Sequence, residues 1–339
     1  MALLEVKDLI THFKTDRGVV QAVNGVTFNL ERGKTLGVVG ESGSGKSVLS
    51  RSIMNLLPRR GLIRKGEVIF DGKVTSTLNA KESRKLYGPG MAMIFQDPMT
   101  SLNPVVKIGR QLTEGLTEHF DVDKKSALLT AEELLRSVGI PEPKRRLDEY
   151  PFQLSGGMRQ RVVIASALAC GPELLFADEP TTALDVTVQK TILNLLASQQ
   201  RERNMAMILV THDLGVVAGR TDDIMVMYVG LVVEKASTAA LFSNMRHPYT
   251  EALLRSIPKL SDPSHTRLDS IPGRPPNLIA PPLGCRFAPR CMYADAQCHE
   301  ELPPLVADPN DSTHLYRCWK PVNISSRPLV DAATSMGSN

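Results

Sequence analysis

The first thirty residues alternate between apolar and polar positions. The alternation runs over residues 3–30 and surrounds two turn signals, at 16–18 and at Asn24–Gly25. Alternation with period two around such turns is typical of antiparallel strands. Short apolar runs at 66–72 and 91–95 also predict strands. The N-terminal part of the chain is therefore predicted to be largely antiparallel β-structure.

The pattern changes to the helical period of 3.6 residues over about 105–166. Ala131–Val138 is the clearest helical segment, and the prolines that follow it mark its end. Two later apolar runs, Leu174–Ala177 and Met207–Val210, have the length and continuity of buried strands. We therefore expect an α/β protein with a mainly parallel core sheet and a helical subdomain.

A glycine-rich stretch, Gly40–Ser47, follows the β-branched run Thr35–Val39 and reads Gly-Glu-Ser-Gly-Ser-Gly-Lys-Ser. Apolar residues with helical spacing come next: Val48, Leu49, Ile53, Leu56 and Leu57. The glycines allow successive backbone N–H groups to point at phosphate oxygens at the positive end of the helix. Lys46 can reach the β- and γ-phosphates, and the Ser47 hydroxyl can complete a Mg²⁺ shell. An unliganded turn is the alternative, but the strand before and the helix after weigh against it.

Three further stretches carry polar groups next to predicted elements. Leu154–Gln160, Leu-Ser-Gly-Gly-Met-Arg-Gln, precedes a helical run and forms either an anion-binding helix N-terminus or a simple cap. Asp178 and Glu179 end an apolar strand, where buried carboxylates require metal or hydrogen bonds. His212 ends another strand and, taken alone, fits a structural histidine better than a catalytic one. Because ligands bind at the carboxyl edge of an open parallel sheet, we expect these groups to share one site with the phosphate loop.

Composition limits the class of protein. With 339 residues, 42% hydrophobic and 22% charged, the chain can form one large or two smaller domains. A net charge of +4 and a pI of about 8.8 are mild and favour an ordinary solvated surface over nucleic-acid binding. The charged N-terminus does not resemble a signal peptide, and no apolar run is long enough to span a bilayer. We expect a cytosolic protein that reaches a membrane only through a partner.

Four of the five cysteines crowd together after a proline-rich segment: Cys285, Cys291, Cys298 and Cys318. In a reducing cytosol this crowding indicates a metal site rather than disulfides. The spacing matches neither zinc ribbons nor bacterial ferredoxins, so the residues alone leave metal and cluster open. The fifth, Cys170, is predicted to be a small buried hydrophobic residue.

The order of these motifs resembles that of ATP-binding-cassette subunits of transporters, over roughly residues 3–235. The resemblance rests on residues 40–47, Gln96, 154–160, 174–179, 183–185 and His212. The run from Asp178 to Val186, and His247–Thr250 before a cysteine-bearing tail, resemble the ATPases of bacterial dipeptide and oligopeptide importers. The particular likeness is to the importer subunit with a C-terminal iron–sulfur site.

This resemblance implies a role for each matching residue. Phe13 would stack on adenine, and the phosphates would be held by Gly40, Glu41, Ser42, Gly43, Ser44, Gly45, Lys46 and Ser47. The catalytic residues would be Glu179, His212, Gln96 and Lys46, with Glu179 polarising the attacking water and His212 contacting the γ-phosphate. Ser47, Gln96 and, through water, Asp178 would surround Mg²⁺.

The resemblance also implies that two ATPase subunits meet face to face. Ser155, Gly156 and Gly157 would cap the γ-phosphate on the partner subunit, and Asp185 would lie at the seam. Two transmembrane permease subunits are further expected partners, and a coupling helix of a permease would enter the helical subdomain. An extracytoplasmic solute-binding protein would be an indirect partner. The second ATPase is expected to be a different chain, giving a heterodimer, on the cytoplasmic face of the bacterial inner membrane. No nucleic acid is expected.

The implied fold is a P-loop, RecA-like α/β domain with an N-terminal antiparallel β subdomain. Residues 1–235 would form this nucleotide-binding domain, with the helical subdomain at about 97–163. Residues 236–325 would form a loop-rich C-terminal extension with the four cysteines, and 326–339 a disordered tail. The expected cofactors are ATP with Mg²⁺ and a [4Fe–4S] cluster, with structural zinc second and unligated thiols third.

The expected function is an importer ATPase that energises uptake of di- or oligopeptides. The same class of importer with a sugar, nickel or other cargo is the first alternative. A soluble DNA-repair ATPase shares the cassette, but it would need a long insertion for which the interval between Ser47 and Leu154 has no room. Drug or lipid exporters usually fuse the cassette to membrane spans, which this sequence does not contain.

Overall fold

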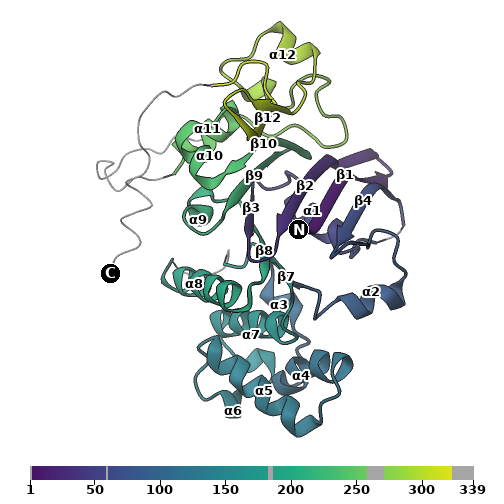
Figure 1. Ribbon diagram of the computed structural model, residues 1–339, viewed down its shortest axis with the longest axis vertical. Coiled ribbons are helices and arrows are strands. Elements are labelled where there is room, and N and C mark those ends of the chain that lie inside the picture. The colour runs from purple at the N-terminus through teal and green to yellow at the C-terminus, as the bar shows by residue number, and fades with distance from the viewer. Residues whose placement is uncertain (1, 59, 182–185, 258–270, 323–339) are drawn as a thin grey trace. The chain divides into compact units, whose positions relative to one another are not determined.

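The computed structural model describes residues 2–58, 60–181, 186–257 and 271–322 (Figure 1). They form two compact units. We call one the helical unit; it comprises Met1–Leu3, Leu30–Lys34 and Asp71–Ile208. The other, the phosphate-loop unit, comprises Leu4–Asn29, Thr35–Phe70 and Leu209–Asn339. The expected disordered tail, 326–339, lies outside the described residues, as does Asp185.

Antiparallel strands form one layer of the phosphate-loop unit, as the alternation predicts. They are β1 (Ala2–Thr15), β2 (Gly18–Glu31) and β4 (Leu62–Phe70), in the order β2-β1-β4. β1 pairs with β4 from Leu4 opposite Phe70 to Phe13 opposite Leu62. The turn predicted at Asn24–Gly25 is wrong, because both residues lie inside β2. Gly25, at φ +62°, instead makes a local irregularity beside Asp8.

A second sheet in the same unit is parallel at its centre. β3 (Thr35–Val39) pairs in parallel with β9 (Asp223–Tyr228), and every residue of β3 is buried. Such burial explains the continuous apolar run that predicted the strand. Helix α1 (Lys46–Ile53) follows β3 and ends before Leu56, which is exposed, so the helix is shorter than its apolar spacing predicts.

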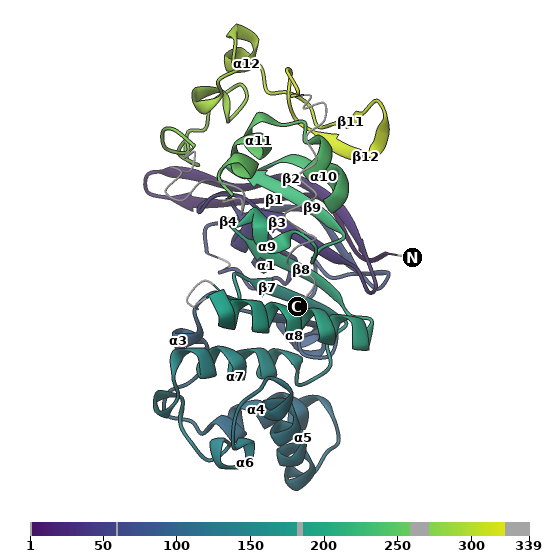
Figure 2. The ribbon, with the colours of Figure 1, turned by 90° about the vertical axis from the view of Figure 1, so that its left-hand side faces the viewer.

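The C-terminal extension adds strands to this sheet. β10 (Leu231–Ser237) pairs antiparallel with β9 on one side and with β12 (Asp311–Tyr316) on the other, and β11 (Val306–Asp308) pairs with β12 (Figure 2). Helix α9 (Leu214–Val217) precedes β9 in the chain. The helices of the extension are α10 (Thr238–Asn244), α11 (Pro248–Arg255), η2 (Ala288–Arg290) and α12 (Ala296–Glu300).

Buried polar contacts connect the extension to β10. Glu234 is fully buried, and its carboxylate accepts hydrogen bonds from the backbone N–H groups of Arg246 (2.6 Å) and His247 (3.0 Å). His314 Nε2 lies 2.7 Å from the same carboxylate. Arg246 also forms a buried ion pair with Asp308. A buried carboxylate is tolerated only with such partners, so these contacts fix the start of the extension.

In the helical unit, two parallel strands are joined by a helical subdomain. β6 (Met91–Ile94) pairs in parallel with β7 (Leu174–Asp178), and both are entirely buried. The helices are α2 (Ala80–Leu86), α3 (Pro98–Ser101), α4 (Ile108–His119), α5 (Lys124–Ser137), α6 (Pro143–Arg146), η1 (Pro151–Gln153), α7 (Gly156–Leu168) and α8 (Val186–Arg203). The remaining strands are β5 (Lys73–Val74) and β8 (Ala206–Thr211), whose last three residues belong to the other unit.

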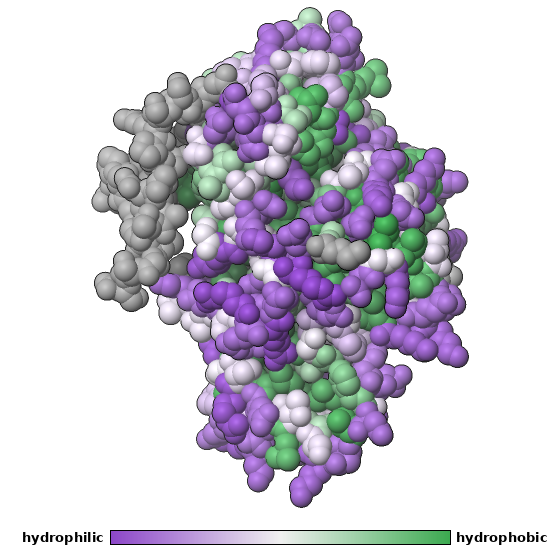
Figure 3. Space-filling model, viewed as in Figure 1, coloured by the Kyte–Doolittle hydropathy of each residue, from purple (hydrophilic) through white to green (hydrophobic). Residues whose placement is uncertain are grey.

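Helices α4, α5 and α7 pack against one another (Figure 1). The clearest predicted helical segment, Ala131–Val138, lies mostly in α5, whose first turn is capped by Asp123. Apolar surface remains exposed on this unit (Figure 3). Its side chains include those of Val105, Leu129 and Phe152. In the described ranges, no helix has both the length and the apolar character needed to cross a bilayer.

Candidate functional site

The backbone of Gly40–Ser47 has a shape that only its glycines allow. A Cβ on Gly40 would lie 2.1 Å from the carbonyl oxygen of Met227, and one on Gly45 would lie 2.1 Å from that of Ala22. Gly43 has a φ of +79°, and its Cβ position faces open space. The loop is therefore held against neighbouring strands at two points and is open at a third, as a cradle for phosphate oxygens requires.

Lys46 is buried at the mouth of the loop. Its Nζ donates hydrogen bonds to the carbonyl oxygens of Gly40 (2.6 Å) and Glu41 (3.0 Å). The hydroxyl of Ser44 is buried and has no hydrogen-bond partner within the described ranges. Helix α1 starts at Lys46 and has no acidic residue in its first turn. Positive charge, an available hydroxyl and a helix N-terminus thus converge where the sequence predicts phosphate binding.

The acidic end of β7 lies in the helical unit. Asp178 is fully buried, and Glu179 follows it with φ +47°, in the left-handed region that non-glycine residues rarely occupy. Gln96 Nε2 donates a hydrogen bond of 2.9 Å to Glu179 Oε2. Backbone strain of this kind is typical of functional positions. The structure thus brings together two of the predicted catalytic residues, which are 83 positions apart.

The signature residues 154–160 also belong to the helical unit. Ser155 caps α7, and its Oγ accepts a hydrogen bond of 3.4 Å from Met158 N–H. Ser155 and Gly156 are exposed, and a Cβ on Gly156 would have no neighbour within 4 Å. Gln160 is buried and donates to the carbonyl oxygen of Pro180, directly after Glu179. Ser155 therefore caps the helix, and anion binding at this helix N-terminus stays a prediction.

The remaining predicted residues lie in the phosphate-loop unit. His212 follows β8 and is exposed. Ser47, in the first turn of α1, is partly buried. Phe13 is partly buried on β1 opposite Leu62 of β4 and is not among the residues that line the cavity beside the phosphate loop.

That cavity, of about 340 Å³, has a wall that sequence reasoning missed. Glu41–Ser44 form one side, with Val20, Tyr228 and Val229. The other side is Pro275–Ile279 of the extension, held where Gln21 N–H donates to the carbonyl oxygen of Leu278 at 2.9 Å. The prolines indicated an extended segment, but nothing in their spacing indicated its position.

The four clustered cysteines line one small apolar cavity together with His247, Phe287 and Trp319. Burial raises the pKa of Cys285 and Cys291, and that of Cys318 to about 12. Backbone N–H groups of Tyr293 and Lys320 donate to the sulfurs of Cys291 (3.4 Å) and Cys318 (3.3 Å). Within the described ranges, however, no group of three or more His, Cys, Asp and Glu side chains is arranged to hold a metal ion. The predicted metal site is thus unsupported, although the thiols are gathered.

The isolated Cys170 is half-buried, and burial raises the pKa of its thiol. Its sulfur lies near Gly88 and Gly115, at positions where a Cβ on either glycine would approach it within about 3 Å. It therefore packs as a small side chain within the helical unit.

Fold and site define the class of protein. A family model described as ABC transporter matches residues 23–182, and one described as the C-terminal region of oligopeptide/dipeptide transporters matches residues 233–298. A dimeric post-hydrolysis structure of the ATP-binding cassette MJ0796, bound to ADP and phosphate, is similar with a TM-score of 0.63 and 28% identity, over 69% of this chain and 98% of that one. The protein is an ABC ATPase, and the expected P-loop α/β fold is confirmed.

Two relatives identify the subfamily of ABC ATPases to which the chain belongs. The oligopeptide transport ATP-binding protein OppD of Bacillus subtilis is 50% identical, over 94% of this chain and 88% of the relative. The dipeptide transport ATP-binding protein DppD of Escherichia coli is 46% identical, over 97% of this chain and all of the relative. The chain therefore belongs to the ATPase subunits of ABC importers of the oligopeptide/dipeptide type. Membership of this family implies ATP with Mg²⁺ and membrane permease partners.

Proposed function

We propose that Glu179 is the general base of ATP hydrolysis in this protein. The observation that carries the assignment is its position directly after the buried strand β7, in a strained backbone conformation and hydrogen-bonded to Gln96. A carboxylate fixed in this way can orient and polarise a water molecule. Gln96, which already contacts the carboxylate, is the group that aligns the water and the metal ion.

The other residues position and neutralise the phosphates. The N–H groups of Gly40–Ser47 and the Nζ of Lys46 bind the phosphate oxygens, and His212 contacts the γ-phosphate. Ser47, Gln96 and, through water, Asp178 would hold Mg²⁺, which would supply charge neutralisation. Ser155–Gly157 act on the nucleotide of a second ATPase subunit. Phosphoryl transfer depends chiefly on such positioning, so hydrolysis requires two subunits and is slow in one.

Glu179→Gln, assayed in the complex with its permeases and partner ATPase, tests this mechanism. Loss of a positioned base should reduce hydrolysis by about 10²–10⁴-fold while ATP still binds. Glu173→Gln is the matched control, because it makes the same change directly before the same strand, on a partly exposed side chain paired with Arg32. Wild-type turnover in Glu179→Gln, or equal losses in both variants, would refute the assignment.

We infer that the transported cargo is di- or oligopeptides, since relatives named for both types of cargo match almost the whole chain. The proposed complex contains two permeases and a second, different ATPase at the cytoplasmic face of the inner membrane, and it receives cargo from an extracytoplasmic binding protein. The exposed Phe152 and Val105 of the helical unit suit contact with a permease helix. Uptake of radiolabelled peptides, compared with nickel and sugars, identifies the cargo.

We further propose that the four cysteines hold a [4Fe–4S] cluster that cross-links the extension and stabilises its fold. The support is that four thiols line one cavity and that amide N–H groups donate to two of the sulfurs, as in thiolate ligation. Anaerobically purified protein should be brown and contain four irons per chain. Colourless protein with one zinc per chain would show that the cysteines hold zinc instead of a cluster.

A further inference from the structure

The extension contacts the phosphate loop through an ion pair. Arg290 Nη1 lies 2.6 Å from Glu41 Oε2, and Nη2 lies 3.0 Å from Glu41 Oε1. This is the bidentate arrangement in which a guanidinium binds a carboxylate most strongly. Glu41 is the first residue after Gly40, so a side chain from 249 positions away holds the start of the phosphate loop.

A second residue of the extension holds the backbone of the same glutamate. Glu41 N–H donates a hydrogen bond of 2.8 Å to the hydroxyl oxygen of Tyr249, a fully buried residue of α11. The carbonyl oxygen of Glu41 in turn accepts the hydrogen bond from Lys46 Nζ. Glu41 is thus fixed through its side chain and its N–H by the extension, while its carbonyl contacts the lysine that meets the phosphates.

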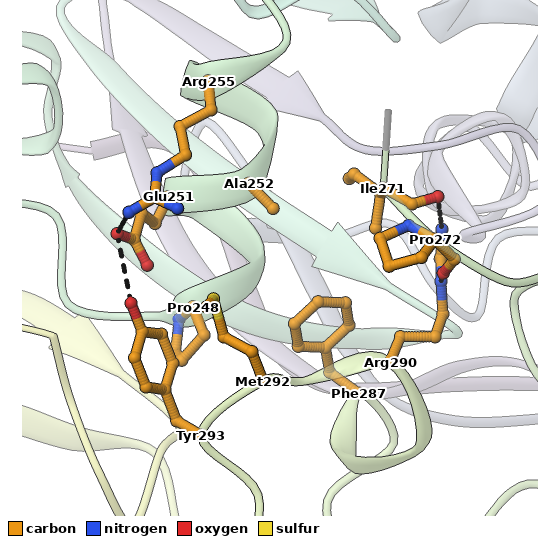
Figure 4. A pocket seen from close by; sticks show the side chains of 10 residues that line it. All are labelled: Pro248, Glu251, Ala252, Arg255, Ile271, Pro272, Phe287, Arg290, Met292 and Tyr293. Carbon is orange, nitrogen blue, oxygen red and sulfur yellow. Dashed lines mark hydrogen bonds and ion pairs between the residues drawn. The ribbon is translucent and has the colours of Figure 1, made fainter. Parts of the chain in front are cut away.

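Arg290 is itself fixed in one orientation (Figure 4). Its side chain is only 3% exposed, and it donates to the carbonyl oxygens of Pro272 (2.9 Å) and Ile271 (3.3 Å) and to the hydroxyl of Tyr228 (3.1 Å). Burial alone would lower its pKa, but the hydrogen bonds to Glu41 and Tyr228 outweigh burial and raise it. The guanidinium therefore remains charged and has little rotational freedom.

A carboxylate beside a phosphate cradle is unfavourable, because it repels the anion that the loop binds. Arg290 neutralises this charge and draws the carboxylate toward the extension. A simple fold-stabilising ion pair is the plainer explanation. Such a pair could lie anywhere on the surface, whereas this one is buried on the arginine side and joins the residue that contacts Lys46.

We propose that Arg290 is a positioning residue for ATP binding: it holds Glu41 so that the phosphate loop keeps its binding-competent shape without net negative charge at its entrance. The proposal rests on ATP being the ligand of the loop. Arg290 is the last residue of η2 and lies between Cys285 and Cys291 in the sequence.

The test is ATP affinity and turnover of the full chain in its transporter complex. Arg290→Met should weaken ATP affinity about 10–30-fold and leave kcat at saturating ATP within about twofold. The reason is that a preorganised loop stabilises bound ATP and the transition state of hydrolysis to the same extent, so its loss affects binding but not the chemical step. Arg290→Lys keeps the positive charge but cannot form both hydrogen bonds to the carboxylate. Its ATP affinity should lie between those of wild type and Arg290→Met. Arg274→Met is the matched control, because Arg274 is exposed in the same extension.

The double variant separates positioning from general stabilisation. Adding Glu41→Gln to Arg290→Met should recover most of the lost affinity, because the uncompensated carboxylate is removed. Unchanged ATP affinity in Arg290→Met, a lower Tm without any change in affinity, or loss of affinity that Glu41→Gln does not relieve would each overturn the proposal. Failure of the wild type to bind ATP would instead contradict the proposed function.

Discussion

The phosphate loop and the cysteine segment are both short, irregular stretches, but they are built in opposite ways. In the loop, the shape comes from the backbone: glycines permit it, and neighbouring carbonyl oxygens leave no room for a Cβ at Gly40 or Gly45. In the segment from Cys285 to Cys318, side chains from separate turns meet at one cavity. Local backbone geometry lets the sequence predict both the phosphate loop and its ligand, whereas the crowded cysteines predict a site and leave its occupant open.

The largest expected effect tests the backbone-built site. Gly40→Val should weaken ATP binding by about 100-fold or more, because its side chain must displace the Met227 carbonyl from 2.1 Å. Ser42→Ala keeps the backbone N–H that would bind phosphate and removes only an exposed hydroxyl, so this variant should bind ATP normally. Equilibrium binding of a fluorescent ATP analogue measures both. Equal affinities for the two variants would show that side chains, not backbone, build the loop.

The next effect tests the side-chain-built site. Cys298→Ser removes a buried thiol and should cost about 3 kcal/mol of stability and all bound iron, if ligation contributes to folding. Cys170→Ser, outside the segment, should retain both the iron and the Tm. Metal analysis and thermal unfolding under anaerobic conditions provide the measurement. Matching behaviour of the two variants would mean that the segment folds without its thiols acting together.

The smallest effect concerns the buried ion pair that secures β11. The hydrogen bond from Arg246 lowers the pKa of Asp308 below its ordinary 3.8. The stabilisation is therefore complete above pH 3.8 and is lost as the pH falls through the lowered, folded-state value. Asp308→Asn should reduce the free energy of unfolding by about 2 kcal/mol at neutral pH. The difference from wild type should shrink on acidification.

Urea denaturation across the pH range measures this difference, with Glu300→Gln, an exposed acid of the same extension, as control. A difference that persists unchanged below the folded-state pKa would show that the asparagine perturbs packing rather than charge.

Local patterns predicted the strands, the phosphate loop and the helix that Ser155 caps, because each depends on neighbours in the chain. Asn24–Gly25 failed as a turn, because pairing of β2 with β1 overrides the local preference of these residues. The resemblance alone assigned Gln96 to the site of Glu179, and their direct hydrogen bond was not predicted. No pattern connects Arg290 with Glu41, since charged residues are common and only the folded extension brings these two together.

Glu234 has a consequence for how the chain can be divided. Its buried carboxylate receives hydrogen bonds from Arg246 and His247 and contacts His314, all of which follow β10 in sequence. A chain cut after Ser237 would keep the acid inside its sheet and lose these three neighbours. The cassette would then bear the desolvation cost of a buried carboxylate without these hydrogen-bond partners. A graft that exchanges extensions between relatives must therefore carry these residues, or replace Glu234 with an apolar residue of similar volume.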